Sequence, residues 1–449
     1  MYDLAIIGGG PAGHVAAENA GAKGMKVVLF EKRELGGVCL NEGCIPTKTL
    51  LYSAKMYDHA TGGKKYGITA EGVSYEYKKI ADRKTKVVRK LVAGIKMKME
   101  THNVEVVRGE AFIKGGNENH IEISCAGAEY IAERLLICTG SEAFVPPIPG
   151  IEGNEAVITN REIIALTEAP QSIVIIGGGV IGMEFASFYN SLGIPVTVIE
   201  MMPEILGGMD CEAGEMLRGI YAKRGVKFHM QCKVARIDGN RVYFTGNEGE
   251  EECVEGEKIL VSAGRRPVLT GYGLENIAIE TERGIKVNGR MQTSMKNVYA
   301  AGDVTGFSML AHTASREAEV AVSHMTGGTD EMRYNAIPGV VYTNPEVSGI
   351  GFTEEQAVKA GIEYRLHKLP MTYSGRFVAE NEGVTGLCKI LTDKEGKVIG
   401  MHMLGNPSSE FISTASLAIS CGMSVEQIKR CVFPHPTVSE IIKETLLEA

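Results

Sequence analysis

The sequence lacks any apolar run approaching the roughly 18 residues that a membrane-spanning helix needs. It also lacks a positive excess, because 47 Lys and Arg stand against 55 Asp and Glu, for a formal net charge of −8. These absences predict a chain that neither crosses a bilayer nor binds nucleic acid or an anionic membrane surface. The N-terminus has no signal-peptide layout, because Leu4–Ile7 run directly into Gly8 as a buried strand would. We therefore expect a cytoplasmic protein.

Most of the ten cysteines show neither close pairing nor metal-ligand spacing, so we expect no metal site. In an intracellular chain such cysteines are usually small buried hydrophobes. We expect burial of eight of them, namely Cys125, Cys138, Cys211, Cys232, Cys253, Cys388, Cys421 and Cys431. The remaining pair, Cys39 and Cys44, is spaced differently.

Glycine is in excess, at 55 of 449 residues. Two stretches place glycines between an apolar strand-like run and a helical run, with an acid ending the next strand-like run. In such a loop the first glycine permits a tight turn and the second lets backbone N–H groups approach a pyrophosphate. The third lets the helix pack closely. The first copy has Gly8, Gly10, Gly13 and Glu31, and the second has Gly177, Gly179, Gly182 and Glu200.

The two acids bear on which cofactors bind. Glu31 and Glu200 would accept hydrogen bonds from adenosine ribose hydroxyls, the alternative being exposed carboxylates at strand ends. A carboxylate at Glu200 repels the 2′-phosphate of NADP, and residues 201–206 hold no Arg or Lys, so NAD is favoured. Two dinucleotide sites in one chain imply two cofactors that exchange a hydride, most simply FAD and NAD.

The predicted fold class is α/β, with two Rossmann-type dinucleotide-binding domains and a C-terminal α+β dimerisation domain. At this length two to four domains are expected. A Pro-rich stretch at 146–150 is a candidate linker, and Gly302-Asp303 after a strand-like run suggests a return to the first domain. The predicted ranges are 1–150 for FAD binding, 151–266 for NAD binding, 267–333 for the return (central) segment and 334–449 for the interface domain. Within the first range we expect long charged helices over 73–101 and short strands over 104–137.

The spacing of Cys39 and Cys44 points to a bridge that opens easily. Residues five apart in an ideal helix are separated by a rise of about 7.5 Å and a rotation of about 140°, so they cannot bridge without distortion. Gly43 and Pro46 could supply that distortion. A strained short-loop disulfide suits a redox-active role, and the alternative is two unrelated core cysteines.

The segment Gly36–Lys48 resembles the active-site signature of the pyridine nucleotide–disulfide oxidoreductases, and in particular their dihydrolipoamide dehydrogenase branch. The resemblance covers essentially the whole chain. Besides the two glycine loops it includes Thr139-Gly140-Ser141, Gly264-Arg265-Arg266-Pro267, Gly302-Asp303, Met309-Leu310-Ala311-His312, and His435-Pro436-Thr437 with Glu440.

The resemblance implies a role for each matching residue. Cys44 would be the thiol next to the flavin and Cys39 the outer thiol that exchanges with substrate. Lys48 would lie beside flavin N5 with Glu184 as its carboxylate partner, the alternative being a solvated helix charge. The implied flavin contacts further include Ala111, Thr139, Gly140, Ser141, Asp303, Met309, Leu310, Ala311 and His312, and the implied NAD contacts include Val234 and Gly264.

A proton acceptor is needed because the thiolate, not the thiol, is the nucleophile. His435 lies between Pro434 and Pro436, and Glu440 could orient its ring. By composition alone His435 would be an ordinary surface histidine. The resemblance implies instead that this pair reaches the disulfide of a partner subunit, and hence a homodimer. One departure is Phe433, where many dihydrolipoamide dehydrogenases carry a second histidine.

The implied activity is oxidation of dihydrolipoamide with NAD⁺. The substrate would arrive on the lipoyl-carrying protein of a 2-oxoacid dehydrogenase or glycine cleavage complex, since this chain has no lipoyl domain. Mercuric reductase and the large thioredoxin reductases would need redox-active C-terminal residues, which are absent from this sequence, and soluble transhydrogenase lacks the paired cysteines found here. A glutathione-type disulfide reductase and a non-catalytic flavin-binding partner protein remain as alternatives.

Overall fold

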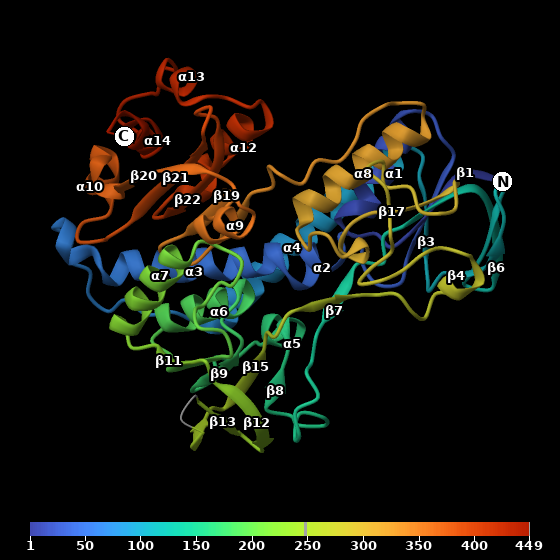
Figure 1. Cartoon of the computed structure of the whole chain (residues 1–449). Coiled ribbons are helices and arrows are strands. Elements are labelled where there is room, and N and C mark those ends of the chain that lie inside the picture. Colours follow the sequence, from blue (N-terminus) through green and yellow to red (C-terminus); the bar gives the residue numbers. More distant parts are fainter. Residues whose placement is uncertain (247–248, 449) are drawn as a thin grey trace. The chain divides into compact units, whose positions relative to one another are not determined.

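A computed structural model of the chain describes residues 1–246 and 249–448. It divides into two compact units, each assembled from three stretches of sequence. Both units combine helices with sheets (Figure 1). The four ranges expected from the sequence divide the chain more finely than these units, and they stay a prediction. Unit 1 consists of Met1–Thr49, Ala81–Phe144 and Gly264–Arg333, and unit 2 consists of Leu50–Ile80, Val145–Ala263 and the residues from Tyr334 onward.

The main sheet of unit 1 has seven strands in the order β3-β2-β1-β6-β5-β4, with β17 also paired to β6. The pairs among β1, β2, β3, β6 and β17 are parallel, whereas β5 pairs antiparallel with β4 and β6. A short antiparallel pair, β7 with β16, lies in the same unit. The strands are β1 (Tyr2–Ile7), β2 (Val27–Glu31), β3 (Glu105–Arg108), β4 (Phe112–Gly116), β5 (Ile121–Cys125), β6 (Ala128–Ile137), β7 (Ser141–Ala143), β16 (Arg265–Pro267) and β17 (Val298–Ala300).

Side chains of β1 alternate between two hydrophobic clusters, with Leu4 and Ile6 on one face and Ala5 and Ile7 on the other. The first cluster also contains side chains of α1 (Pro11–Ala22) and α8 (Ala311–Met325), which lie side by side in Figure 1. A strand buried on both faces is apolar at nearly every position. The first glycine loop joins β1 to α1, so it lies at the carboxyl edge of this parallel sheet, where such folds bind ligands.

Unit 2 contains a parallel sheet of five strands in the order β11-β10-β9-β15-β8. Helix α6 (Val180–Ser191) follows β9 and is largely buried. The helix begins directly after Gly179, which is its N-cap. The strands are β8 (Val157–Ile158), β9 (Ile173–Ile176), β10 (Val196–Glu200), β11 (Lys227–Met230) and β15 (Lys258–Val261).

Two antiparallel sheets complete unit 2. One has the order β12-β13-β14, and the other has the order β18-β19-β22-β21-β20. One face of the second sheet packs against α12 (Ser413–Ser420) and α14 (Glu440–Leu447). The strands are β12 (Lys233–Asp238), β13 (Arg241–Thr245), β14 (Glu251–Glu255), β18 (Gly339–Val341), β19 (Val347–Gly351), β20 (Tyr364–Pro370), β21 (Leu387–Asp393) and β22 (Val398–Leu404).

The remaining helices connect or cover these sheets. The long charged region expected over 73–101 forms the single helix α4 (Tyr77–Thr101). Within the described part of the chain, no helix combines the length and hydropathy of a membrane span. The others are α2 (Gly37–Glu42), α3 (Cys44–Thr61), α5 (Asn160–Ala165), α7 (Cys211–Lys223), α9 (Glu354–Lys359), α10 (Gly375–Glu380), α11 (Ser408–Phe411) and α13 (Val425–Lys429).

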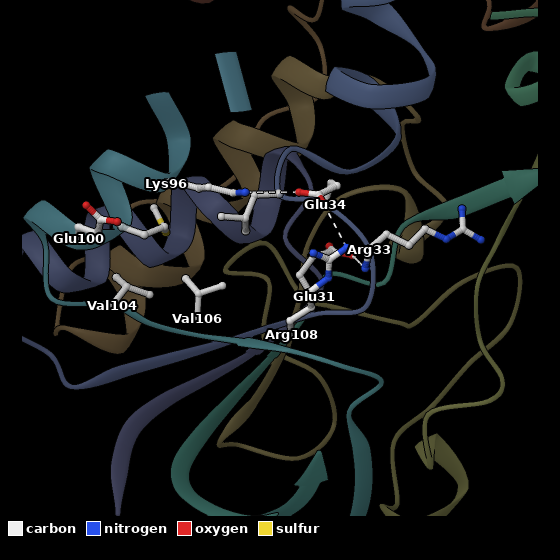
Figure 2. A pocket seen from close by; sticks show the side chains of 10 residues that line it. Glu31, Arg33, Glu34, Lys96, Glu100, Val104, Val106 and Arg108 are labelled. Atoms are coloured by element: carbon white, nitrogen blue, oxygen red, sulfur yellow. Dashed lines mark hydrogen bonds and ion pairs between the residues drawn. The ribbon is translucent and has the colours of Figure 1, made fainter. Parts of the chain in front are cut away.

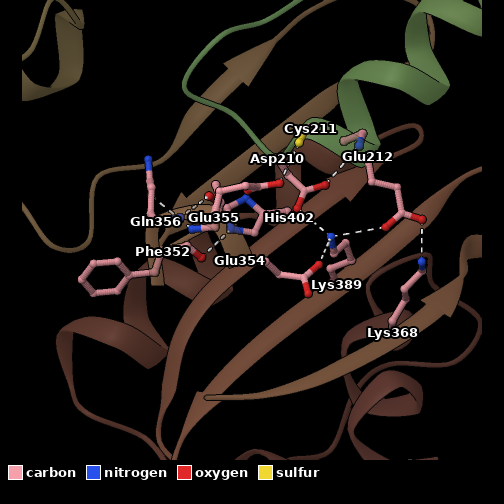
Figure 3. A network of polar contacts seen from close by, with 12 residues as sticks. Asp210, Cys211, Glu212, Phe352, Glu354, Glu355, Gln356, Lys368, Lys389 and His402 are labelled. Atoms are coloured by element: carbon pink, nitrogen blue, oxygen red, sulfur yellow. Dashed lines mark hydrogen bonds and ion pairs between the residues drawn. The ribbon is translucent and has the colours of Figure 1, made fainter. Parts of the chain in front are cut away.

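A buried lysine connects β21 to two helices of unit 2 (Figure 3). Lys389 Nζ lies 2.8 Å from the Asp210 carboxylate and 3.3 Å from that of Glu212, and it also pairs with Glu354. Asp210 in turn caps α7, because its side chain accepts the Ala213 N–H at 3.1 Å. One cation therefore fixes the start of α7 and the start of α9 on the sheet.

The expectation that eight cysteines are buried is wrong for half of them. Four are buried as expected: Cys125, Cys138, Cys232 and Cys388. Four are exposed: Cys211, Cys253, Cys421 and Cys431. Each exposed one lies at an element end or on a partly solvated strand; Cys211, for example, is the first residue of α7 and donates to Glu355 at 2.6 Å.

Candidate active site

Two positions of the first glycine loop have a geometry that only glycine fits. Gly8 has φ +103°, and a Cβ there would lie 2.3 Å from the Cys138 carbonyl oxygen. A Cβ on Gly13 would lie 1.8 Å from the Gly8 carbonyl oxygen. In contrast, a Cβ on Gly10 would meet nothing closer than 3.9 Å, and no side chain caps the helix α1 that Gly10 begins. The tight turn therefore requires glycine at Gly8, and the close packing of α1 requires it at Gly13. The uncapped N-terminus of α1 leaves N–H groups available to an anion.

The second loop repeats this arrangement in unit 2. Gly177 has φ +106°, and its Cβ would lie 2.6 Å from the Ser262 carbonyl oxygen. A Cβ on Gly182 would lie 2.0 Å from the Gly177 carbonyl oxygen. Gly179 has nothing within 4 Å of a Cβ position, and no side chain caps α6. Both loops therefore combine a tight turn and close helix packing with an open, uncapped helix start.

The two strand-end acids are held in matching positions. Glu31 accepts the Gly9 N–H at 2.7 Å and the Arg33 N–H at 2.7 Å. Glu200 accepts the Gly178 N–H at 2.6 Å and the Met202 N–H at 2.7 Å. Each carboxylate is thus tied to its own glycine loop, which keeps a negative charge at the position where the sequence predicts a ribose.

A cavity of about 350 Å³ opens beside Glu31 in unit 1 (Figure 2). Its charged lining includes Arg108 and Lys96, which pair with Glu34 at 3.1 and 3.5 Å. Apolar side chains complete the lining, namely Leu35, Met99, Val104 and Val106. The cavity offers an apolar wall and hydrogen-bonding groups next to the predicted ribose acid.

The cysteine pair lies at a break between two helices. Helix α2 ends at Glu42, Gly43 has the non-helical values φ −147° and ψ −109°, and α3 begins at Cys44. Pro46 lies in the first turn of α3, where a missing N–H costs no helical hydrogen bond. Cys39 and Cys44 are both thiols in this structure, and a hydrogen bond joins their side chains. The break removes the helical geometry that would keep the two sulfurs apart.

The cysteine helix also touches the first glycine loop. Gly37, the first residue of α2, has φ +56°, and a Cβ there would lie 2.7 Å from the Gly10 Cα. A side chain at Gly37 would therefore push α2 away from the loop. Cys39, two residues further on, is held close to the predicted pyrophosphate site by this backbone contact.

The environment of Cys39 favours its protonated form. The hydrogen bond with Cys44 raises the pKa of the Cys39 thiol, burial and repulsion from an ionised Cys44 raise it further, and the charge of Lys48 opposes these shifts. Because the thiolate is the nucleophile, exchange at Cys39 requires a proton acceptor.

Ser141, Asp303 and Arg265 form a polar cluster in unit 1. The Ser141 hydroxyl donates to the Asp303 carboxylate, and Arg265 Nε donates to the same hydroxyl oxygen at 2.8 Å. Arg265 also donates to the Ser141 carbonyl oxygen at 2.8 Å. Burial raises the pKa of Asp303, and the Ser141 hydrogen bond and the charge of Arg265 oppose that shift. The sequence assigned cofactor contacts to Ser141 and Asp303, whereas Arg265 appeared only within a matching motif; in the structure its side chain holds Ser141.

A second residue that the sequence did not single out is Glu317. It is fully buried in α8, and its carboxylate accepts the Gly302 N–H at 2.6 Å. The predicted contacts Met309, Leu310, Ala311 and His312 form the start of this helix, which no side chain caps. An acid on the otherwise apolar stripe of α8 was the available signal for Glu317, because such a residue needs a fixed partner when it is buried.

His435 and Glu440 form a dyad on the surface of unit 2. His435 Nδ1 lies 3.0 Å from Glu440 Oε1, and the Thr437 N–H donates to Glu440 Oε2 at 2.8 Å. The His435 side chain is 80% exposed and that of Glu440 only 21%. The Thr437 N–H and His435 lower the pKa of Glu440. The carboxylate is thus anchored, and it orients an imidazole that faces outward.

Family models match nearly the whole chain. Residues 2–318 match the pyridine nucleotide-disulphide oxidoreductases, and residues 337–446 match the dimerisation domain of that family. The chain belongs to this family. It is 36% identical over 455 residues to the dihydrolipoyl dehydrogenase of Mycoplasma pneumoniae, covering 100% of this chain and 98% of that protein. It is 39% identical over 453 residues to the dihydrolipoyl dehydrogenase of Thermus scotoductus, covering 99% and 96%.

Solved structures are also similar along the whole chain. LpdA from Mycobacterium tuberculosis has a TM-score of 0.90 at 26% identity, with 99% of each chain covered. The HOCl-induced flavoprotein disulfide reductase RclA from Escherichia coli has a TM-score of 0.86 at 28% identity, again with 99% of each chain covered. The predicted fold class, with a C-terminal dimerisation domain, is confirmed.

As a pyridine nucleotide-disulphide oxidoreductase, the chain is an enzyme of the dihydrolipoyl dehydrogenase type that uses FAD and NAD(H). The residues present fit both cofactors. The uncapped starts of α1, α6 and α8 offer N–H groups to phosphates, and the space beside Gly179 leaves room for one. Glu31 and Glu200 are the carboxylates that would accept hydrogen bonds from the ribose hydroxyls.

The remaining cofactor contacts predicted from the family resemblance are divided between the two units. Lys48 belongs to unit 1 and Glu184 to unit 2, where the buried Glu184 carboxylate accepts the Tyr342 N–H at 3.0 Å. Their pairing stays a prediction. Among the other predicted contacts, the Thr139 hydroxyl donates to the Val268 carbonyl oxygen at 3.0 Å, and Ala111 is buried. Gly140 and Gly264, both in unit 1, have the positive φ values +71° and +111°. Val234 is buried in β12 of unit 2.

Proposed function

We propose that this enzyme oxidises protein-bound dihydrolipoamide to lipoamide with NAD⁺ as the electron acceptor. The observation that carries the proposal is the Cys39–Cys44 pair at the α2–α3 break, one backbone contact away from the first glycine loop. Relatives named dihydrolipoyl dehydrogenase support the choice of dithiol substrate.

Groups of this chain are sufficient to account for the protons and electrons of the dithiol step. His435 accepts a proton from one thiol of dihydrolipoamide, and the resulting thiolate attacks Sγ of Cys39, which breaks the Cys39–Cys44 bond. The second substrate thiol then loses its proton as its sulfur attacks the substrate sulfur of the mixed disulfide, which forms lipoamide and releases Cys39. The thiolates left on Cys39 and Cys44 take up the two substrate protons, one of them through His435. The substrate loses two electrons and two protons, and the cysteine pair is reduced. The chemistry supplied by bound FAD and NAD⁺ is acceptance of that electron pair and hydride transfer.

Cys39 and Lys48 have distinct tasks in this scheme. The raised pKa of Cys39 makes it a thiol at neutral pH, so in the reverse direction it too must lose its proton to a base before it can attack a disulfide. The positive charge of Lys48 opposes that shift, and we assign to it the stabilisation of negative charge at the reduced centre, with Glu184 as its partner.

We propose that the base acts on the disulfide of a second copy. The His435 ring is 80% exposed and is oriented by Glu440 within the region that matches the dimerisation domain. An outward-facing oriented imidazole is suited to complete a site on a partner subunit. The working unit would then be a homodimer whose substrate arrives on a lipoyl-carrying protein.

Steady-state kinetics with two disulfides and two nicotinamides test the proposal. We expect turnover of lipoamide with NADH, and much lower rates with glutathione disulfide or NADPH, because the Glu200 carboxylate repels a 2′-phosphate. Glutathione disulfide as the better substrate would favour a glutathione-type reductase. Absence of turnover with every disulfide would favour a flavin-binding partner protein.

The variant Cys44→Ser makes the test specific. It should abolish lipoamide turnover and leave NADH–dye activity, because only the dithiol is removed. Cys421→Ser, at an exposed cysteine remote in sequence, is the matched control and should match the wild type. Equal loss of both activities in Cys44→Ser would contradict the proposed order of electron transfer.

A further inference from the structure

Helix α4 carries an exposed cluster of three cations, Lys86, Arg89 and Lys90, which we call the basic face. The three residues lie at spacings of three and four, so their side chains share one side of the helix. Val92 and Met99 of the same helix are buried, and Met99 belongs to a hydrophobic cluster of unit 1. The basic face is therefore the solvent side of an amphipathic helix.

The basic face differs from three other cations of α4, which form ion pairs with acidic side chains. Lys79 pairs with Glu76 at 2.6 Å, Lys96 with Glu34 at 3.5 Å and Lys98 with Glu18 at 3.0 Å. Among residues 1–246 and 249–448, none pairs with or hydrogen-bonds to the side chains of Lys86, Arg89 or Lys90. Like charges at these spacings repel each other by a few tenths of a kcal/mol per pair. Within the described part of the chain, no ion pair to these three side chains offsets this repulsion, although Asp82 lies one turn before Lys86.

The basic face lies on the helix that contacts the cysteine-bearing helix. Arg83, one turn before Lys86, donates from Nη1 to the Thr49 carbonyl oxygen at 2.9 Å. Thr49 belongs to α3, which begins at Cys44. At about 1.5 Å rise per residue, Lys90 is about 10 Å along α4 from Arg83. The unpaired cations therefore begin one helical turn from a direct contact with the helix of the reactive thiol.

We propose that the basic face is the docking surface for an acidic patch on the protein that carries the dihydrolipoyl group. This inference rests on the proposed function and names the surface that receives its substrate. The chain as a whole carries a net charge of −8, so it repels an acidic protein over most of its surface. A local cluster of three cations next to α3 would steer such a protein toward the dithiol, which raises the association rate.

The test compares a free substrate with a protein-bound one. In the triple variant Lys86→Gln, Arg89→Gln, Lys90→Gln, kcat/KM for a reduced lipoyl domain of net negative charge should fall about tenfold at low ionic strength. The value for free dihydrolipoamide should be unchanged, because the small substrate is not steered by this face. Binding of the oxidised lipoyl domain, measured calorimetrically, should weaken in parallel and lose most of its dependence on salt.

A matched control removes the same charge elsewhere. Lys227, Lys359 and Lys394 are exposed and lie in unit 2, and their triple change to Gln should leave the rate with the lipoyl domain at the wild-type value.

An equal fall in both triple variants would show that only net charge matters and would overturn the inference. So would an unchanged rate in the α4 variant, or an equal loss with free dihydrolipoamide. Salt-sensitive RNA binding that the α4 variant loses would assign the face to another class of partner. Failure of the wild type to oxidise either substrate would instead refute the proposed function.

Discussion

The imidazole of His435 and the carboxylate of Glu440 lie 3.0 Å apart, and the other oxygen of that carboxylate holds the Thr437 N–H at 2.8 Å. One carboxylate thus joins the ring to the backbone beside it. The Thr437 N–H and His435 lower the pKa of Glu440, so this group stays ionised down to a pH below the usual Glu value of about 4.3. An ionised Glu440 can orient His435 and stabilise its protonated form throughout the neutral range.

Replacing the base should slow only the dithiol reaction. We expect His435→Gln to lower the rate of dihydrolipoamide oxidation by about 10²-fold or more, because the thiol then has no positioned proton acceptor. Glu440→Gln should have a smaller effect, about tenfold, since the imidazole remains. Stopped-flow mixing with dihydrolipoamide measures this step, and NADH–dye activity should be retained in both variants. The exposed His59, changed to Gln, is the control. An unchanged rate in His435→Gln would remove this residue from the mechanism.

Changing Glu200 should alter the choice of nicotinamide. Its carboxylate is fixed by two N–H groups beside the second glycine loop, at the predicted position of the ribose 2′-hydroxyl. Glu200→Gln removes the negative charge, so the ratio of kcat/KM for NADH to that for NADPH should fall at least tenfold. Glu31→Gln changes the equivalent acid of the first loop and should leave this ratio unchanged while weakening retention of FAD. A ratio that does not move in Glu200→Gln would exclude electrostatic selection at this position.

The sequence predicted the parts of the fold that local geometry dictates. Gly8 and Gly13 are required because a Cβ at either would overlap a carbonyl oxygen, so the glycine pattern itself specifies the turn. The break between Cys39 and Cys44 follows similarly, because Gly43 adopts a non-helical conformation within a six-residue segment.

Contacts between distant segments could not be predicted in this way. Arg265 is 124 residues from Ser141, and only the pairing of β16 with β7 brings them together. The sequence alone likewise does not identify the hydrogen-bond partner of Glu317. The fold supplies this partner by bringing the Gly302 N–H beside the Glu317 carboxylate. The prediction that all eight cysteines are buried failed for the same reason. Residue type alone does not indicate that Cys211 begins a helix and lies next to Glu355.

Two glycines of the second loop should respond differently to alanine. In Gly182→Ala the Cβ would lie 2.0 Å from the Gly177 carbonyl oxygen, so α6 must move and the thermal midpoint should fall by several degrees. Gly179→Ala has open space for its Cβ, so the midpoint of the NAD-free enzyme should stay within about 1–2 °C. Its KM for NADH should rise, since the methyl group would occupy the place of a phosphate. Equal destabilisation by both changes would contradict this division between packing and binding.

Lys389 and Lys368 provide a final comparison between a buried and an exposed cation that share Glu212 (Figure 3). Burial acts to lower the pKa of Lys389, but hydrogen bonds with Asp210 and Glu354 outweigh it, so the lysine stays charged. Lys389→Met would leave the buried Asp210 carboxylate without its cation and should destabilise unit 2 by about 3–5 kcal/mol, measured as a lower urea midpoint. Lys368→Met removes a 42% exposed side chain and should cost about 1 kcal/mol or less.

Because the loss in Lys389→Met comes from an uncompensated charge, adding Asp210→Asn to Lys389→Met should restore part of the stability. A double variant no more stable than Lys389→Met alone would mean that lost packing of the lysine chain, not charge, dominates.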